Sequence, residues 1–145
     1  GRPKKKAAKK KVRPSGPAPC AVLWGLGPSC GQESAAKGEK IRAVCREMGL
    51  RVREVGPERL GDAAGAFAGL VGMRPAFTPY DGPVPECEFL LLCNLNNAQV
   101  DEFLARSREA GCVVDAKALL TKQNKAWPLI RLIEAVAAEH RQMSA

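Results

Sequence analysis

The feature that most constrains the fold is an apolar strand followed by an amphipathic helix, a pattern that occurs twice along the chain. The apolar runs at 20–27 (CAVLWGLG) and 87–95 (CEFLLLCNL) have the length and composition of buried strands. Behind each run, apolar side chains recur at helical spacing until a glycine ends the helix, Gly49 in the first half and Gly111 in the second. Strands that alternate with helices predict a largely parallel sheet with helical crossovers.

Each half continues with a second strand and a second helix. The second strands are expected at 50–55 and 112–120, and both halves share the motif Arg-Glu-x-Gly just before them. The chain therefore predicts an α/β domain of about four strands built from two β-α-β-α repeats. Repeat one is expected to span 20–73, the joint 74–86 and repeat two 87–143, which together make a single domain.

The second helix of the first half is predicted more weakly than the second helix of the second half. The segment 57–72 predicts a weak helix with Leu60, Ala64, Phe67 and Val71 on one side, and the last helix is expected within 120–140. Thr121 or Asn124 is expected to cap that last helix through a side-chain oxygen. Asn124 is favoured as the start because Pro128 fits only the first turn of a helix.

Residues 1–19 differ from the rest of the chain in charge. They hold eight of the 23 basic residues and no acidic residue, so the remaining 15 basic residues balance all 15 acidic ones. The segment has four prolines and no aromatic side chain, and we expect it to be a disordered tail when unbound. The candidate contacts to nucleic acid are its cations Lys4, Lys5, Lys6, Lys9, Lys10, Lys11 and Arg13.

The cysteines and the single histidine give little support for catalysis or metal binding. No two of the six cysteines have Cys-x-x-Cys spacing, and His140 lies near the C-terminus, so neither a metal site nor a Cys–His nucleophile is expected. We assign no catalytic residue and no cofactor, and enzyme activity is the less favoured interpretation. The basic start lacks the apolar run of a secretory signal, and the most apolar window is too short to cross a bilayer. A cytoplasmic protein with reduced thiols and no membrane contact is expected.

The candidate ligand-binding residues follow the first strand of each half. Ligands of open parallel sheets bind outside the carboxyl ends of the strands. Neither loop carries a nucleotide-binding fingerprint, so turn glycines and a helix cap at Asn96 or Asn97 are the favoured interpretation. The residues concerned are Gly25, Gly27, Ser29, Cys30, Asn94, Asn96 and Asn97.

The second half also carries a family resemblance. Its features are a strand ending in a short polar turn (LLLCNLNN), then Arg-Glu-x-Gly, and then Leu-Thr followed by Asn-x-x-Trp and Leu-x-x-Leu in LLTKQNKAWPLIRLI. Over about residues 86–143 the chain resembles the bacterial family catalogued as domain of unknown function 3783. The resemblance implies a small cytosolic bacterial domain and brings no established activity. The first half lacks the Asn-x-x-Trp piece and resembles the family only as a diverged repeat.

Two functions from different classes follow from these patterns. The first is a non-catalytic interaction module whose polybasic tail contacts nucleic acid or the ribosome without sequence specificity. The alternative is a small-molecule- or anion-binding α/β domain, enzymatic in its strongest form, that uses the loops after the first strand of each repeat. A third and weaker hypothesis is redox sensing through Cys30 together with Cys45 or Cys20.

Overall fold

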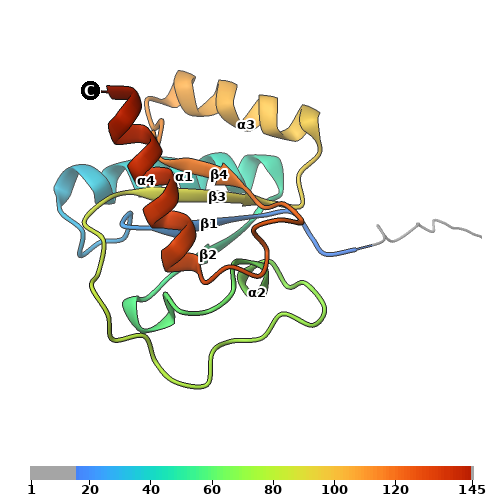
Figure 1. Ribbon diagram of the computed structural model, residues 1–145. Helices are drawn as coiled ribbons and strands as arrows, with labels where there is room; N and C mark the ends of the chain where they lie inside the picture. Colours follow the sequence, from blue (N-terminus) through green and yellow to red (C-terminus); the bar gives the residue numbers. More distant parts are fainter. Residues whose placement is uncertain (1–15, 145) are drawn as a thin grey trace, which may run out of the picture.

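The computed structural model describes residues 16–144, which form a four-stranded sheet with helices on both faces (Figure 1). The strands lie in the order β2-β1-β3-β4, and the prediction of an α/β domain with four strands is confirmed. Along the chain the elements are β1 (Cys20–Trp24), α1 (Gln32–Met48), β2 (Arg51–Glu54), the 3₁₀ turn η2 (Pro57–Arg59), α2 (Ala64–Phe67), β3 (Phe89–Cys93), α3 (Asn97–Ala110), β4 (Lys117–Leu119) and α4 (Leu129–Ser144).

The sheet is mostly parallel, with one antiparallel pair at its centre. β1 pairs with β2 and β3 pairs with β4 in parallel, each around one crossover helix, as the alternation of elements predicts. The two halves meet where β1 and β3 run antiparallel, with Val22 opposite Leu91 at the middle of the pair. The carboxyl ends of β1 and β3 therefore lie at opposite ends of the sheet.

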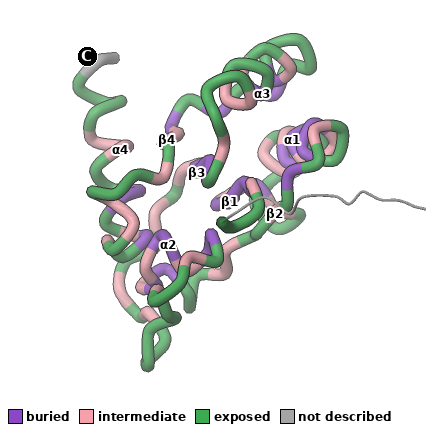
Figure 2. The backbone as a smooth tube through the Cα atoms, turned by 90° about the vertical axis from the view of Figure 1, so that its right-hand side faces the viewer, coloured by how far each residue is buried: buried purple, intermediate pink, exposed green. Residues whose placement is uncertain are grey.

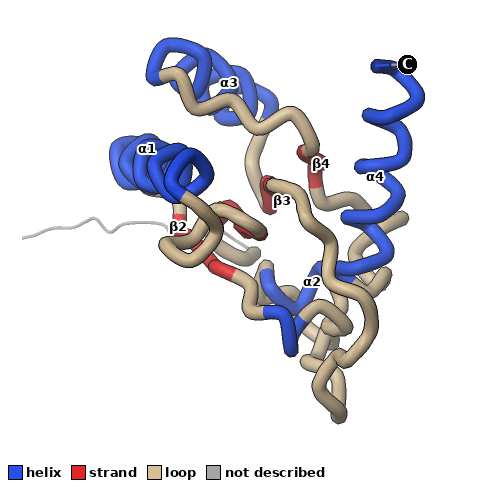
Figure 3. Tube along the Cα trace, turned by 90° about the vertical axis from the view of Figure 1, so that its left-hand side faces the viewer, coloured by secondary structure: helices blue, strands red, loops and turns tan. Residues whose placement is uncertain are grey.

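Both faces of the sheet are covered by helices. Figure 2 shows α1 and α3 together on one side of the strands and α4 on the other side, with α2 below it, and Figure 3 shows the same layers from the opposite direction. Ala21 and Leu23 pack beneath α1 and α3, whereas Val22 and Trp24 pack beneath α2 and α4. Because β1 and β3 are buried on both faces, they read in the sequence as continuous apolar runs.

The shared Arg-Glu-x-Gly motif has a local explanation. Gly49 and Gly111 both adopt the left-handed conformation, and each donates its N–H to a carbonyl of the last helical turn, that of Arg46 or Arg108. Glycine is favoured at this position because it lacks the Cβ atom that opposes a positive φ. The motif thus follows from two similar helix ends, and common ancestry of the two halves stays a prediction.

The second helix of the first half is much shorter than predicted. Only η2 and the four-residue α2 form, and Val71, expected on the buried side, is fully exposed. The physical reason is the glycine content of the segment, since each glycine costs a helix roughly 1 kcal/mol relative to alanine. The backbone of this segment instead forms hydrogen bonds with residues around the start of α4: Ala64 N donates to Trp127 O at 2.9 Å, and Leu129 N donates to Asp62 O at 2.8 Å.

The prediction that Thr121 or Asn124 caps the last helix is also wrong. The two residues instead form hydrogen bonds with each other across a turn: Thr121 N donates to Asn124 Oδ1 at 2.9 Å, and Asn124 N donates to Thr121 Oγ1 at 3.1 Å. α4 begins at Leu129, directly after Pro128. The tryptophan of the Asn-x-x-Trp motif, Trp127, lies in this turn with the Arg131 guanidinium 4.2 Å from the centre of its ring.

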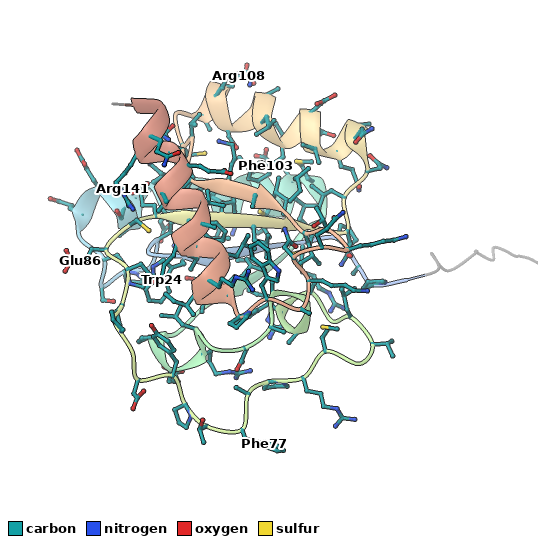
Figure 4. All side chains as sticks on the ribbon, viewed as in Figure 1. Trp24, Phe77, Glu86, Phe103, Arg108 and Arg141 are labelled. Atoms are coloured by element: carbon teal, nitrogen blue, oxygen red, sulfur yellow. The ribbon has the colours of Figure 1, made fainter. Side chains whose placement is uncertain are left out.

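The joint between the halves is a loop anchored at several points. The buried carboxylate of Asp62 accepts a hydrogen bond from Ala76 N at 2.8 Å and also pairs with Arg59. Near its end, Pro85 O accepts a hydrogen bond from the Trp24 indole at 3.2 Å, which holds the loop against the end of β1. Between these anchors the loop projects outward, with Phe77 fully exposed at the bottom of Figure 4.

The structure describes only the last four residues of the predicted tail, 16–19. Of these, Gly16, Pro17 and Ala18 are exposed, and Pro19 O accepts a hydrogen bond from Arg51 N at 3.1 Å. The seven predicted contacts to nucleic acid, Lys4 to Arg13, lie outside the described residues. Within 16–144, no helix has the length and apolar character needed to cross a membrane.

Candidate functional site

A large hollow lies where the parallel strands β1 and β2 end. We call it the β1–β2 cleft; its volume is about 750 Å³. It contains all four residues predicted from the first loop: Gly25, Gly27, Ser29 and Cys30. The remaining walls come from residues 23–26, from Ser34, from 54–57 at the end of β2, and from 84–88 at the end of the joint.

The backbone at the floor of the β1–β2 cleft requires glycine. Gly25 has a φ of 76°, and a Cβ atom there would overlap the carbonyl oxygen of Cys87. Gly38 of α1 has a similar role, because a Cβ atom there would overlap the carbonyl oxygen of Leu26. These glycines let the joint and α1 approach the end of β1 closely, which is the backbone role that the sequence favoured for the glycines of this loop.

Carboxylates dominate the charge of the β1–β2 cleft. Glu88 accepts hydrogen bonds from Lys37 Nζ and Ser34 Oγ, each at 2.7 Å. Burial by itself raises the pKa of Glu88, but the two hydrogen bonds and the Lys37 charge outweigh it, so the pKa lies below its ordinary value. Glu54 pairs with Arg42 at 3.0 Å, and Glu86 also lines the cleft. Lys37 and Arg42 neutralise two of these carboxylates, so the charge of Glu86 and the apolar walls suit a neutral or cationic ligand better than the anion considered from the sequence.

The start of α1 borders the same cleft. Gly31 is the N-cap residue and supplies no side-chain hydrogen bond, and the thiol of Cys30 is exposed beside it. Among residues 16–144, no three His, Cys, Asp or Glu side chains gather in a way that would hold a metal ion. The site thus offers a shaped, partly apolar hollow with turn glycines.

The three predicted asparagines lie at the opposite end of the sheet. Asn96 is the N-cap of α3, and it exchanges hydrogen bonds with Gln99 at 2.8 Å in both directions. This confirms the predicted cap, and Asn97 is the first residue of the helix. Because β3 runs antiparallel to β1, the structure separates these residues from the β1–β2 cleft. The two predicted groups therefore do not form one site.

Asn94 has a more unusual position than its neighbours. Its φ of 67° makes it the one described residue other than glycine with a positive φ. Its side-chain amide donates to Ala18 O at 3.1 Å and to Ala68 O at 3.4 Å. Asn94 thus joins the start of the folded chain to the end of α2 across the end of β3.

These two segments border a smaller hollow of about 190 Å³, which we call the Cys20 cleft. It is lined by Pro17, Ala18, Cys20, Arg51, Arg53, Phe67, Ala68 and Gly69. Arg51 and Arg53 are exposed, and Arg53 Nη1 donates to Phe67 O at 3.1 Å. Neither arginine forms an ion pair with a described residue. Sequence reasoning missed them, although the alternation Arg-Val-Arg in a strand places both on one face.

The six cysteines all carry free thiols and differ in their surroundings. Cys20 and Cys93 lie in the apolar cluster on the α4 side of the sheet, whereas Cys45 and Cys112 lie in the cluster beneath α1 and α3. Burial raises the pKa of Cys45 to about 12. The sequence hypothesis of redox sensing named Cys30, which is exposed, and it did not pair Cys20 with Cys93.

The comparison with known families concerns the second half of the chain. Residues 88–143, from just before β3 to the last turn of α4, match the family model described as Domain of unknown function (DUF3783). This confirms the resemblance expected from the sequence over those residues, including the turn that holds Trp127. No curated protein and no solved structure matches the chain.

Proposed function

We propose that this chain, whose second half carries that domain of unknown function, is a non-catalytic cytoplasmic interaction module that binds nucleic acid through its basic tail. The observation that carries the proposal is the charge at the junction between the tail and the folded part. Eight basic residues of the sequence precede residue 16, and the chain then enters the sheet beside the exposed Arg51 and Arg53. The two arginines add two cations to the folded surface beside Pro17 and Ala18, near the start of the described chain.

The chemistry of this surface fits the phosphate backbone. Lysine and arginine side chains neutralise phosphates and release condensed counterions, which gives affinity without reading bases. The tail has no aromatic side chain on which a base could stack, so binding is expected to be independent of sequence. Ribosomal RNA and other structured or single-stranded RNA present the same phosphates.

The test is the salt dependence of binding to mixed-sequence RNA and duplex DNA. The 145-residue chain is compared with a variant of the same length in which all eight basic residues of the tail are replaced by Gln. For duplex DNA, each phosphate contact that is lost flattens the slope of log K against log salt by about 0.9. The proposal expects the neutral-tail variant to bind weakly, with a much flatter slope to which only Arg51 and Arg53 still contribute. If this variant binds as tightly and with the same slope as the parent, the proposal is wrong.

A second pair of variants separates the folded surface from total charge. Arg51→Gln with Arg53→Gln should flatten the slope by up to about 1.8. The matched control, Arg108→Gln with Arg141→Gln, removes the same charge from α3 and α4, away from the entry of the chain (Figure 4). Equal slopes for the two pairs would mean that Arg51 and Arg53 act only through net charge.

A second candidate function rests on the β1–β2 cleft. Its volume of about 750 Å³ falls within the range of small-molecule sites, and Trp24, Val55 and Pro57 supply apolar walls. The charge of Glu86 favours a neutral or cationic compound with hydrogen-bond donors. This candidate belongs to the alternative function expected from the sequence, restricted to the loop after β1.

Thermal-shift measurements against nucleosides, polyamines and anions test this candidate. A ligand that fills the cleft raises the melting temperature, and Ser29→Ala with Cys30→Ala should reduce that shift. Asn97→Ala is the control, because Asn97 is exposed at the opposite end of the sheet. If the Ser29→Ala, Cys30→Ala variant shows the same ligand-induced increases in melting temperature as the parent, the cleft is excluded as the ligand site.

A further inference from the structure

Cys20 and Cys93 face each other across the central strand pair. They are direct partners in the antiparallel register of β1 and β3, so their side chains leave the same face of the sheet. The backbone groups of Leu90 and Leu92 bond toward β4, where Leu90 N donates to Ala116 O and Leu92 O accepts from Leu120 N. The backbone groups of Cys93 therefore point toward β1.

This arrangement sets the spacing of the two cysteines. Partners that exchange backbone hydrogen bonds have Cα atoms about 5.5 Å apart. That spacing lies within the range of roughly 4.4–6.8 Å that disulfides bridge. No other pair among the six cysteines consists of direct cross-strand partners.

Cys20 also lines a hollow that opens to solvent. It is only 3% exposed, but it forms part of the Cys20 cleft, which has room for a small oxidant. The exposed Arg51 and Arg53 line the same cleft and stabilise negative charge on the sulfur. Cys93 belongs to the same apolar cluster, has no exposed surface and does not line the cleft.

The two thiols differ in acidity in the direction that a stepwise oxidation requires. The neighbouring Cys93 lowers the pKa of Cys20; burial opposes this effect, and the charges of Arg53 and Arg51 lower the pKa further. The neighbouring Cys20 and burial both raise the pKa of Cys93, whose thiol donates to Leu91 O at 3.9 Å. Because Cys20 lines the cleft together with both arginines and Cys93 does not, we assign Cys20 as the attacking thiol.

We propose that Cys20 and Cys93 form a peroxide-reactive dithiol that closes into a reversible disulfide between β1 and β3. The Cys20 thiolate attacks a hydroperoxide, the O–O bond breaks, and the departing hydroxide takes a proton to leave as water. Cys20 then carries a sulfenic acid. The Cys93 sulfur attacks the Cys20 sulfur, and the hydroxyl group leaves with the Cys93 proton as a second water. The two sulfurs are oxidised and the peroxide is reduced.

The product is expected to be readily reduced by a dithiol. Direct partners in a sheet have Cβ atoms about 5 Å apart, whereas a relaxed disulfide holds them at about 3.8 Å. Closing the bond therefore strains the central strand pair, and strained disulfides have the higher reduction potentials of labile bridges.

The experiment uses the full chain with Cys30→Ser, which removes the exposed thiol. After treatment with hydrogen peroxide, the mass should fall by that of two hydrogen atoms, and dithiothreitol should restore it. Cleavage after glutamate should yield peptide 1–33 linked to peptide 89–102, which contain Cys20 and Cys93. Cys45 and Cys112 are the internal control, because both are buried on the other face and should remain reduced. If Cys20 and Cys93 are still free thiols when Cys87 or Cys45 has been oxidised, the proposal is wrong.

Three variants assign the roles within the pair. Cys93→Ser should stop the reaction at the sulfenic acid on Cys20, which dimedone traps, and Cys20→Ser should leave Cys93 reduced. Arg51→Gln with Arg53→Gln should slow the oxidation of Cys20 and move its pH profile to higher pH. A Cys93→Ser protein that gives no dimedone adduct while its circular dichroism matches the parent would overturn the assignment of Cys20 as the attacking thiol.

Discussion

The side-chain amide of Asn94 donates to the carbonyl oxygen of Ala18 at 3.1 Å, so a residue that ends β3 holds the segment through which the basic tail enters the fold. The same residue follows Cys93 directly and has a left-handed backbone. One position therefore borders the tail, the Cys20 cleft and the central strand pair.

Replacing Asn94 should separate its backbone role from its hydrogen bonds. Asn94→Ala loses both amide hydrogen bonds and places alanine, which adopts a positive φ less readily than asparagine, at this position. We therefore expect the free energy of unfolding to fall by about 1–2 kcal/mol. Asn94→Gly loses the same hydrogen bonds but accepts the φ of 67°, and should cost less. Urea unfolding measures both, with Asn97→Ala as a near-neutral control. Equal losses for Ala and Gly would show that the backbone conformation carries no cost.

Gly25→Ala should be among the most damaging single-methyl additions to the chain. The new Cβ atom would overlap the Cys87 carbonyl, and alanine also resists the φ of 76°. We expect a loss of about 2–5 kcal/mol in the free energy of unfolding. Gly27→Ala is the matched control, since the nearest atom to its Cβ would be Glu54 Oε1 at 3.7 Å and its φ is not positive. Similar losses for the two variants would contradict this account.

Glu88→Gln should reduce stability at neutral pH and have little effect in acid. Because the folded-state pKa of Glu88 is lowered, its carboxylate stabilises the fold above the unfolded pKa, and this contribution is lost as the pH falls through the folded pKa. For a partly buried pair we expect about 1 kcal/mol at pH 7. Urea unfolding from pH 7 to acid measures the difference between parent and variant. A difference that stays constant with pH would rule out the ionised carboxylate as its source.

Cys45 should make the fold sensitive to alkali. Its folded-state pKa is raised to about 12. The neutral Cys45 thiol therefore makes its full contribution to the free energy of unfolding below the pKa of cysteine in the unfolded chain, and this contribution is lost as the pH rises through the folded-state pKa. Between those values the free energy of unfolding should fall by about 1.4 kcal/mol per pH unit from this thiol. Cys45→Ala should be less stable at pH 7 because of lost packing, and should show a shallower alkaline slope. Cys30→Ala, at an exposed site, should keep the parental slope.

The sequence predicts the elements of this fold better than their orientation. The apolar runs that contain β1 and β3, the cap at Asn96 and the helix ends at Gly49 and Gly111 depend on local chemistry, and each is found where the residues place it. The direction of β3 relative to β1 depends on how the joint packs, through Asp62 and through the Trp24 bond to Pro85. Such long-range contacts leave no periodic signal in the sequence.

The candidate sites follow the same division. The glycines after β1 were recognisable because a strand followed by a glycine-rich turn is a local pattern, and Gly25 and Gly27 do line the β1–β2 cleft. The Cys20–Cys93 pair was not recognisable, because it depends on the antiparallel register and that register is set by the joint. The prediction of a helix over 57–72 was wrong for a third reason. Glycines weaken a helix even where the spacing of the apolar residues is adequate.

The antiparallel centre of the sheet also has a consequence for the order of assembly. Within each half, paired strands are close in the chain, as with Cys20 and Arg51, whereas Val22 and Leu91 must close a loop of more than twice that length. Local contacts form faster than distant ones, so each half is expected to condense before the two dock. Docking then resembles the association of two subunits on one tether. At high concentration the β1 of one chain can meet the β3 of another, and the joint becomes the hinge of a domain-swapped dimer.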